Sequence, residues 1–102
     1  MQVGWTPLYK AQLLEKALGL NFIYVKDDGR NPTASFKDRA SAIGVAKAIE
    51  LDKKIMCAAS TGNAASSLSG FAACAGIPSY IFVPVATPEA MILVQNVQIN
   101  LK

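Results

Sequence analysis

A long stretch without charge constrains the fold of this chain more than any other feature. Residues 55–88 contain no Asp, Glu, Lys or Arg, although charged residues make up 17% of the 102-residue sequence. A membrane-spanning helix would also lack charge, but serines, an asparagine and prolines interrupt the stretch before about 18 purely apolar residues accumulate. We therefore expect this stretch to form elements that are buried on both faces inside an α/β protein.

Helix and strand patterns alternate along the chain. Helices are expected at residues 11–18, 36–51 and 64–75 and after Thr87, and strands at residues 21–25, 55–59, 80–83 and 97–101. In the second helix, the apolar residues at i, i+3, i+4 and i+7 predict a core face made of Ala42, Val45, Ala46 and Ile49. Such alternation predicts a parallel sheet with crossover helices, whose ligands bind beyond the carboxyl ends of the strands. The loops at residues 29–37 and 60–63 occupy such positions.

The first of these loops presents a candidate nucleophile, Lys37. Ser35 can cap the following helix and Asp38 can complete a capping box, which places Lys37 in the first helical turn. The helix dipole and Arg39 should both disfavour the ammonium form of Lys37, leaving an amine that can form a Schiff base with an aldehyde. Two plainer interpretations are a solvated surface lysine, and a simple anion site made of Lys37, Arg39 and the helix N-terminus.

The second loop, Ser60-Thr61-Gly62-Asn63, leaves an uncharged strand and enters an uncharged helix. Hydroxyls, a glycine and an amide at a helix N-terminus favour a bound carboxylate or phosphate, and Gly62 lets the backbone approach the ligand closely. The plainer interpretation is that Ser60 or Asn63 merely caps the helix.

Composition excludes several other kinds of site. There is no histidine, which argues against Ser-His and Cys-His catalysis and against an ordinary zinc centre. Cys57 and Cys74 fit no metal or redox spacing and are expected to be small buried residues. A net charge of +3 without a basic stripe does not indicate a nucleic-acid partner. The N-terminus lacks a signal-peptide pattern, so we expect a cytoplasmic protein. We expect neither a metal nor a membrane partner.

Three motifs together resemble one enzyme family. Residues 26–40, which read KDDGRNPTASFKDRA, closely resemble the cofactor-lysine motif of the threonine synthase family, which belongs to the fold type II pyridoxal phosphate (PLP) enzymes. Gly4-Trp5-Thr6-Pro7-Leu8 looks like the G-x-T-P-L signature of that family, and residues 59–65, ASTGNAA, look like its asparagine loop. The three motifs stand in the family's order, and the resemblance covers about residues 3–84.

The resemblance implies a role for each motif. Lys37 would bind PLP covalently and move protons between the substrate carbons and the cofactor, and Asn63 would bond to the 3′-oxygen of the PLP ring. The residues implied to hold the substrate α-carboxylate are Ser60, Thr61, Gly62, Asn63 and Ala64. Some relatives have threonine where this chain has Ala64. The implied reaction converts O-phospho-L-homoserine and water to L-threonine and phosphate, with PLP as electron sink.

Other functions remain open on the sequence alone. A threonine dehydratase or cysteine synthase would share the superfamily, whereas a non-catalytic anion-binding or assembly module would use Lys37 and Arg39 only to attract phosphate. From Val85 onward the resemblance weakens, and the relatives are several times longer. We therefore expect residues 1–102 to form one incomplete PLP-binding α/β domain that forms homo-oligomers or is completed by another chain.

Overall fold

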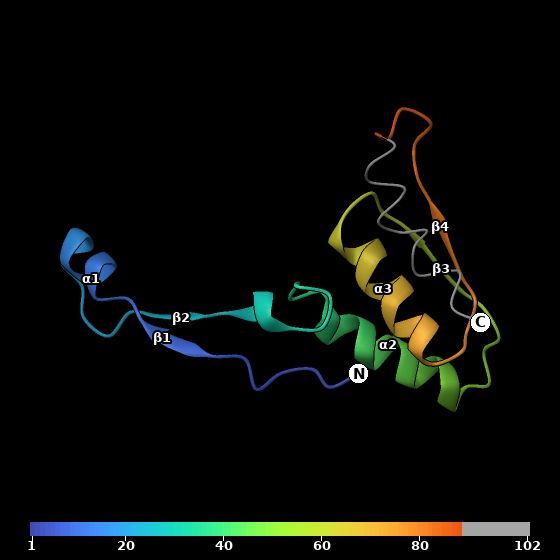
Figure 1. Cartoon of the computed structure of the whole chain (residues 1–102), viewed down its shortest axis with the longest axis horizontal. Helices are drawn as coiled ribbons and strands as arrows, with labels where there is room; N and C mark the ends of the chain where they lie inside the picture. The colour runs from blue at the N-terminus through green and yellow to red at the C-terminus, as the bar shows by residue number, and fades with distance from the viewer. Residues whose placement is uncertain (89–102) are drawn as a thin grey trace.

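The computed structural model describes residues 1–88 of the chain. Its elements are β1 (Leu8–Lys10), α1 (Gln12–Leu18), β2 (Tyr24–Lys26), a 3-10 turn (Asp28–Arg30), α2 (Asp38–Glu50), β3 (Met56–Ala59), α3 (Asn63–Cys74) and β4 (Ser79–Phe82). The helix expected after Thr87 and the strand expected at residues 97–101 lie outside the described residues. Figure 1 shows a body built around α2, α3, β3 and β4, and a narrow arm that carries β1, α1 and β2.

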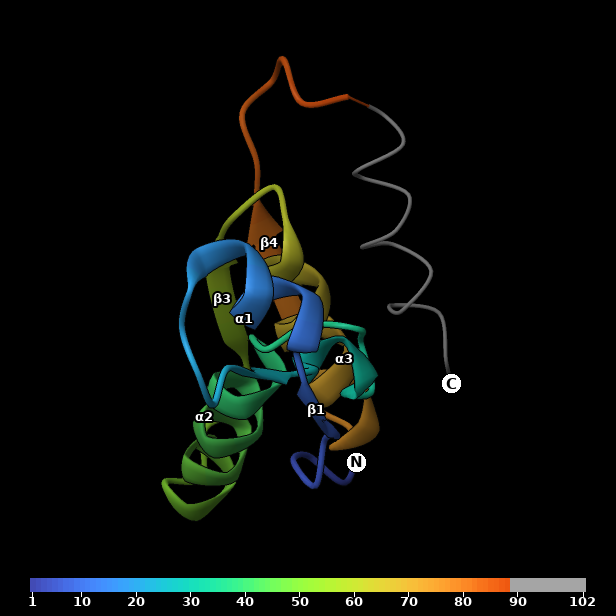
Figure 2. The same ribbon diagram turned by 90° about the vertical axis from the view of Figure 1, so that its left-hand side faces the viewer.

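The body confirms the predicted α/β class. β3 and β4 pair in parallel, with Met56 opposite Ser79 and Ala59 opposite Phe82, and α3 is the crossover helix between them. α3 contacts both this strand pair and α2, and Figures 1 and 2 show these elements next to one another. The crossover helix ends at Cys74, and Gly76, the predicted stop signal, follows it with a φ of 70°.

The expected burial of the sheet on both faces is wrong for the described residues. In β3, Met56 and Ala58 are half-buried, whereas Cys57 and Ala59 are exposed. β4 alternates in the same way. One face packs on α3, and the described chain offers no second layer for the other face. Cys57 is therefore exposed, and so is Cys74, contrary to the expectation that both cysteines are buried.

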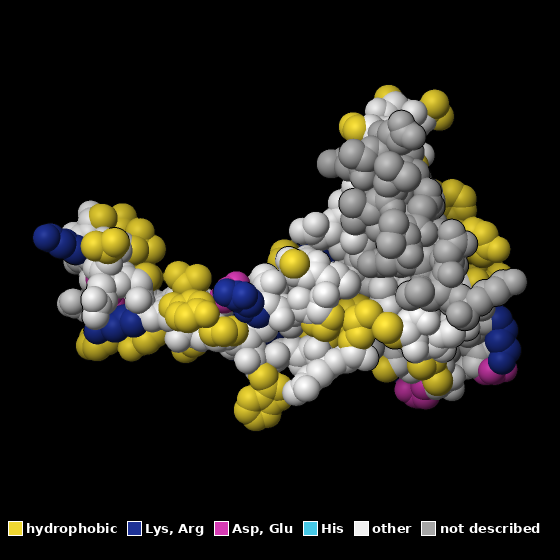
Figure 3. All heavy atoms as spheres, in the orientation of Figure 1, with side chains coloured by type: hydrophobic (Ala, Val, Ile, Leu, Met, Phe, Trp, Pro, Cys, Tyr) yellow, Lys and Arg dark blue, Asp and Glu magenta, His cyan; other side chains and the backbone are white. Residues whose placement is uncertain are grey.

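The arm was not predicted as such. β1 pairs with β2 in antiparallel register, with Leu8 opposite Lys26 and Lys10 opposite Tyr24, whereas the sequence suggested only parallel strands. No residue of β1, α1 or β2 is buried. Leu13 is 87% exposed and Phe22 is 78% exposed, and Figure 3 shows hydrophobic side chains over much of the arm.

The core lies between α2 and α3, but the buried face of α2 differs from the predicted one. The buried residues of α2 are Asp38, Ser41, Val45 and Ala48. Only Val45 belongs to the predicted face, and it packs with Phe71 and Ala72 of α3. α2 is rotated about its axis relative to the predicted orientation, because the Ser67 hydroxyl of α3 bonds with polar groups of α2.

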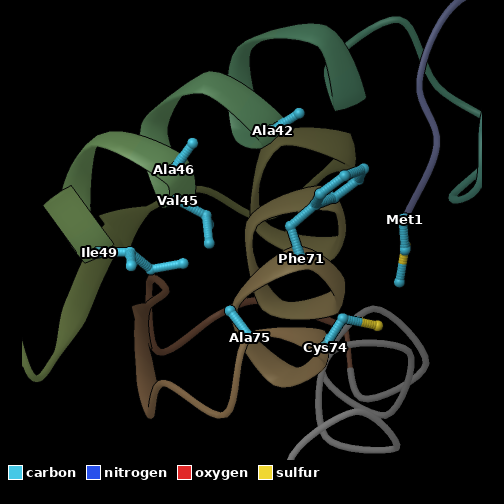
Figure 4. A pocket seen from close by; sticks show the side chains of 8 residues that line it. All are labelled: Met1, Ala42, Val45, Ala46, Ile49, Phe71, Cys74 and Ala75. Atoms are coloured by element: carbon cyan, nitrogen blue, oxygen red, sulfur yellow. The ribbon is translucent and has the colours of Figure 1, made fainter.

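The predicted apolar face of α2 borders a hollow instead. This hollow has a volume of about 210 Å³ and lies between α2 and α3 (Figure 4). Its lining residues are Met1, Ala42, Val45, Ala46, Ile49, Phe71, Cys74 and Ala75. Because none of these described lining residues is Asp, Glu, Lys or Arg, they offer no charged side chain to a phosphate or a carboxylate.

Candidate functional site

Lys37 lies at the start of α2, directly before its first residue. Its backbone has helical angles, φ −61° and ψ −22°, and its carbonyl accepts a hydrogen bond from the Ser41 N–H at 3.0 Å. Ser35 Oγ accepts the Lys37 N–H at 3.1 Å, a serine turn that spans two residues rather than the predicted capping box. Lys37 was predicted in the first helical turn and instead lies at the N-cap, one residue before the helix, and the predicted cap by Ser35 is wrong.

The side chain of Lys37 is half-buried and rests on its neighbour. Lys37 Nζ lies 4.3 Å from the centroid of the Phe36 ring, an arrangement that attracts a cation. Arg39 points its guanidinium at a carboxylate, Asp28. Since that pairing neutralises Arg39, the argument that its free charge acts on Lys37 loses its basis.

A polar cluster joins Asp28, Arg39 and Thr6. Arg39 Nε and Nη2 donate to the two carboxylate oxygens of Asp28 at 2.7 and 2.8 Å, and Thr6 Oγ1 donates to Asp28 Oδ1 at 2.6 Å. The hydrogen bonds from Arg39, followed by that from Thr6, hold the pKa of the Asp28 carboxyl well below its usual range. Lys26 Nζ also donates to the Thr6 carbonyl.

The first motif is thereby bonded to the lysine motif. The Gly4 N–H donates to Asn31 Oδ1 at 3.1 Å, and Asn31 Nδ2 donates to the Asp28 carbonyl at 2.9 Å. Gly4 has a φ of 90°, which side-chain-bearing residues rarely adopt. The G-x-T-P-L segment therefore braces the loop before Lys37.

The second loop leads from β3 into α3 through Gly62. Ser60 Oγ accepts the Gly62 N–H at 3.2 Å. In the part of the chain that the structure describes, no side chain caps α3, so the interpretation that Ser60 or Asn63 is merely a helix cap is wrong. Asn63 and Ala64 are exposed in the first turn, where backbone N–H groups favour an anion.

A buried network that the sequence did not reveal joins the first loop and α2 to α3, the helix that follows the second loop. Asp38 is fully buried and accepts hydrogen bonds from the N–H and hydroxyl of Thr33 and from Ser67 Oγ. Ser67 Oγ also lies 2.7 Å from Ser41 Oγ, whose proton completes the chain of donors. The serines of α3, a helix without charged residues, were the one sequence feature that could have indicated a hydrogen-bond partner for Asp38.

These contacts bring the predicted site residues to adjoining helix ends. Asp38 follows Lys37, and Ser67 lies about one turn beyond Asn63. Among residues 1–88, no three His, Cys, Asp or Glu side chains gather where they could hold a metal ion. None of the helices described is both long enough and apolar enough to cross a membrane.

Comparison with known proteins yields one family. The family model described as "Pyridoxal-phosphate dependent enzyme" matches residues 1–97. A protein named threonine synthase from Methanosarcina acetivorans is 46% identical over 84 residues, which is 82% of this chain and 21% of that protein. A threonine synthase from Methanocaldococcus jannaschii is also 46% identical, over 79% of this chain and 20% of its own length. The chain thus spans about a fifth of the length of these curated relatives.

Solved structures share the fold. The processed form of threonine deaminase isoform 2 from Solanum lycopersicum superposes with a TM-score of 0.77 at 29% identity, over 91% of this chain and 26% of its own. A pyridoxal 5'-phosphate-dependent aspartate racemase superposes with a TM-score of 0.86 at 20% identity, over 95% of this chain and 31% of its own. The second likeness supports the fold alone.

Proposed function

This chain belongs to the pyridoxal-phosphate-dependent enzyme family, and we propose that it carries the cofactor lysine and the substrate loop of a threonine synthase. The observation that carries the proposal is the placement of Lys37 and of the uncapped start of α3 at adjoining ends of two packed helices. The 46% identity to two threonine synthases over most of the chain supports the same assignment.

The residues present fit PLP. Lys37 offers an amine, and Asn63 offers an exposed side-chain amide that can donate to the 3′-oxygen of the ring. When bound, PLP supplies an electron sink for the substrate carbons. Lys37 would hold the cofactor and carry protons to and from those carbons, while the Asn63 amide would fix the orientation of the ring.

The loop before α3 would hold the substrate α-carboxylate. The residues proposed for this role are Ser60, Thr61, Gly62, Asn63 and Ala64. Ser60 Oγ uses a lone pair for the Gly62 N–H and therefore keeps its own proton for a carboxylate oxygen. The proposed substrate is O-phospho-L-homoserine, which water converts to L-threonine and phosphate.

The first test is covalent capture of the cofactor. After incubation with PLP and reduction with borohydride, peptide mass spectrometry should find the adduct mainly on Lys37. Lys37→Ala should abolish this labelling. Lys47→Ala should not, because the Lys47 side chain is 57% exposed in the last turn of the same helix and bonds to Glu50. Equal labelling of both lysines in the parent chain would contradict the proposal.

The second test concerns the reaction. Phosphate release from O-phospho-L-homoserine is expected and deamination of threonine is not. The superposition on a threonine deaminase favours the second activity as an alternative, so finding it alone would replace the synthase assignment. A third outcome is that phosphate ions bind and stabilise the chain while PLP never labels Lys37. The chain would then be a non-catalytic anion-binding module.

A further inference from the structure

Asp38 is the only charged side chain among residues 1–88 that is buried. Burying a carboxylate is costly unless hydrogen-bond donors hold it. The Thr33 N–H donates at 2.7 Å, the Thr33 hydroxyl donates as well, and Ser67 Oγ donates at 2.6 Å. No Lys or Arg pairs with Asp38 in the described part of the chain. Neutral donors and the N-terminal end of the α2 dipole therefore hold the charge.

The donors come from two separate segments on either side of the proposed site. Thr33 belongs to the loop four residues before Lys37, and Ser67 belongs to α3 about one turn after Asn63. Asp38 directly follows Lys37. One carboxylate thus links the lysine loop, the start of α2 and the start of α3.

The backbone around Lys37 has little freedom left. Its N–H is bonded to Ser35, which is buried, and its carbonyl is bonded to the N–H of Ser41. Only the side-chain torsions of Lys37 remain, and these now lay the amine on the Phe36 ring. The position of the amine relative to α3 therefore depends on the bridge that Asp38 makes.

We propose that Asp38 is a positioning residue, which sets the separation between the Lys37 amine and the Asn63 amide. This inference rests on the proposed function of Lys37 and Asn63. A carboxylate suits the role because it only accepts hydrogen bonds, and every group that faces it is a donor. An asparagine at this position would turn its own N–H toward one of those donors.

The test compares two aldehydes on the complete 102-residue chain. PLP with borohydride reports the placement of the amine against the α3 loop, as the ratio of labelling at Lys37 to that at Lys47. Formaldehyde with borohydride reports only whether Lys37 is accessible. Asp38→Asn should lower the PLP ratio about tenfold and Ser67→Ala about threefold, with formaldehyde labelling changed less than about twofold. Ser69→Ala is the matched control and should leave the PLP ratio unchanged, because the Ser69 hydroxyl is buried on α3 without a hydrogen-bond partner among the described residues.

Each outcome has a defined meaning. A PLP ratio that stays within about twofold of the parent in both variants overturns the role of Asp38. A parallel loss of PLP and formaldehyde labelling in folded Ser67→Ala also overturns it, because the bridge would then control access rather than placement. If Asp38→Asn does not fold, the labelling of Ser67→Ala alone tests the role of Asp38. If the parent itself shows no preference for Lys37, the proposed function fails and the role of Asp38 falls with it.

Discussion

Asp28 is one of the residues that bond the first motif to the lysine motif. Its carboxylate is bonded to both Arg39 and Thr6, so the folded chain binds a proton at Asp28 less readily than the unfolded chain does. A depressed carboxyl pKa stabilises the fold above the unfolded-state pKa and loses that contribution as the pH falls through the folded-state value. The contribution should therefore be present at neutral pH and decline in acid.

Asp28→Asn tests this link. At pH 7 the variant should have a lower thermal midpoint than the parent, and the gap should narrow as the pH falls below about 4, where an ordinary carboxyl is protonated. Asp52→Asn is the control, because that side chain is 83% exposed and, among residues 1–88, is paired only with Lys54. Thermal unfolding followed by circular dichroism at several pH values gives the result. A difference in thermal midpoint that does not change with pH would contradict the stabilising role of the Asp28 carboxylate.

Individual residues were predicted where a motif is local in sequence. The position of Lys37 at a helix start and the loop at Gly62 both follow from neighbouring residues. The partners of Asp38 could not be predicted, because Thr33 and Ser67 approach it from different directions and one of them lies in another helix. Ser35 was in reach of several N–H groups, and sequence alone could not choose between them.

At the scale of elements, α2 and α3 show what the spacing of apolar residues can and cannot predict. Their bounds followed the predicted spans closely, since the turn residues that flank the helices are local in sequence. The buried face of α2 was predicted wrongly because apolar spacing ignored the hydroxyl of the facing helix. Likewise, β1 is only three residues long, which left no pattern to read, so its antiparallel pairing with β2 emerged only in the structure.

Two glycines of these helices should respond oppositely to alanine. Gly44 lies inside α2 with open space where a Cβ would stand, so Gly44→Ala should raise the free energy of unfolding by about 1 kcal/mol. Gly76 follows α3 with a φ of 70° and lets the Ile77 N–H reach the Ala72 carbonyl at 2.9 Å. Gly76→Ala should lower the free energy of unfolding by about 1 kcal/mol. Urea titration measures the free energy of unfolding of both variants. Changes of the same sign and size would contradict the different roles given to the two glycines.

At the scale of the whole molecule, two surfaces lack cover in residues 1–88. The outer face of the β3–β4 pair exposes Tyr80 and Phe82, and the arm exposes Leu13 and Phe22. The charge-free stretch at residues 55–88 led to the expectation of layers on both sides of the strands. It could not indicate that the described chain supplies only one of them. Exposed apolar surface of this kind favours association.

We therefore expect the isolated chain to self-associate through the arm. Leu13→Lys should shift the chain toward monomer, because Leu13 is 87% exposed on α1. Gln12→Lys adds the same charge to the adjacent position of the same helix and should change the assembly less. Light scattering coupled to size-exclusion chromatography at matched concentration distinguishes the two. Identical profiles for both variants would exclude the arm as the contact.

The arm also has a consequence for the length of the chain. Its base is closed where the Asp27 N–H donates to the Pro7 carbonyl at 3.0 Å, and its tip is closed where the Ala11 N–H donates to the Ile23 carbonyl at 2.9 Å. Residues 12–22, which comprise α1 and the segment that returns to β2, thus lie between two fixed ends, and a flexible insertion after α1 would form a loop held at those ends. The entropy of closing such a loop costs only about 0.6 kcal/mol more for each doubling of its length. The tip of the arm is accordingly where insertions, tags or reporter peptides can be accommodated while the geometry of the lysine loop is preserved.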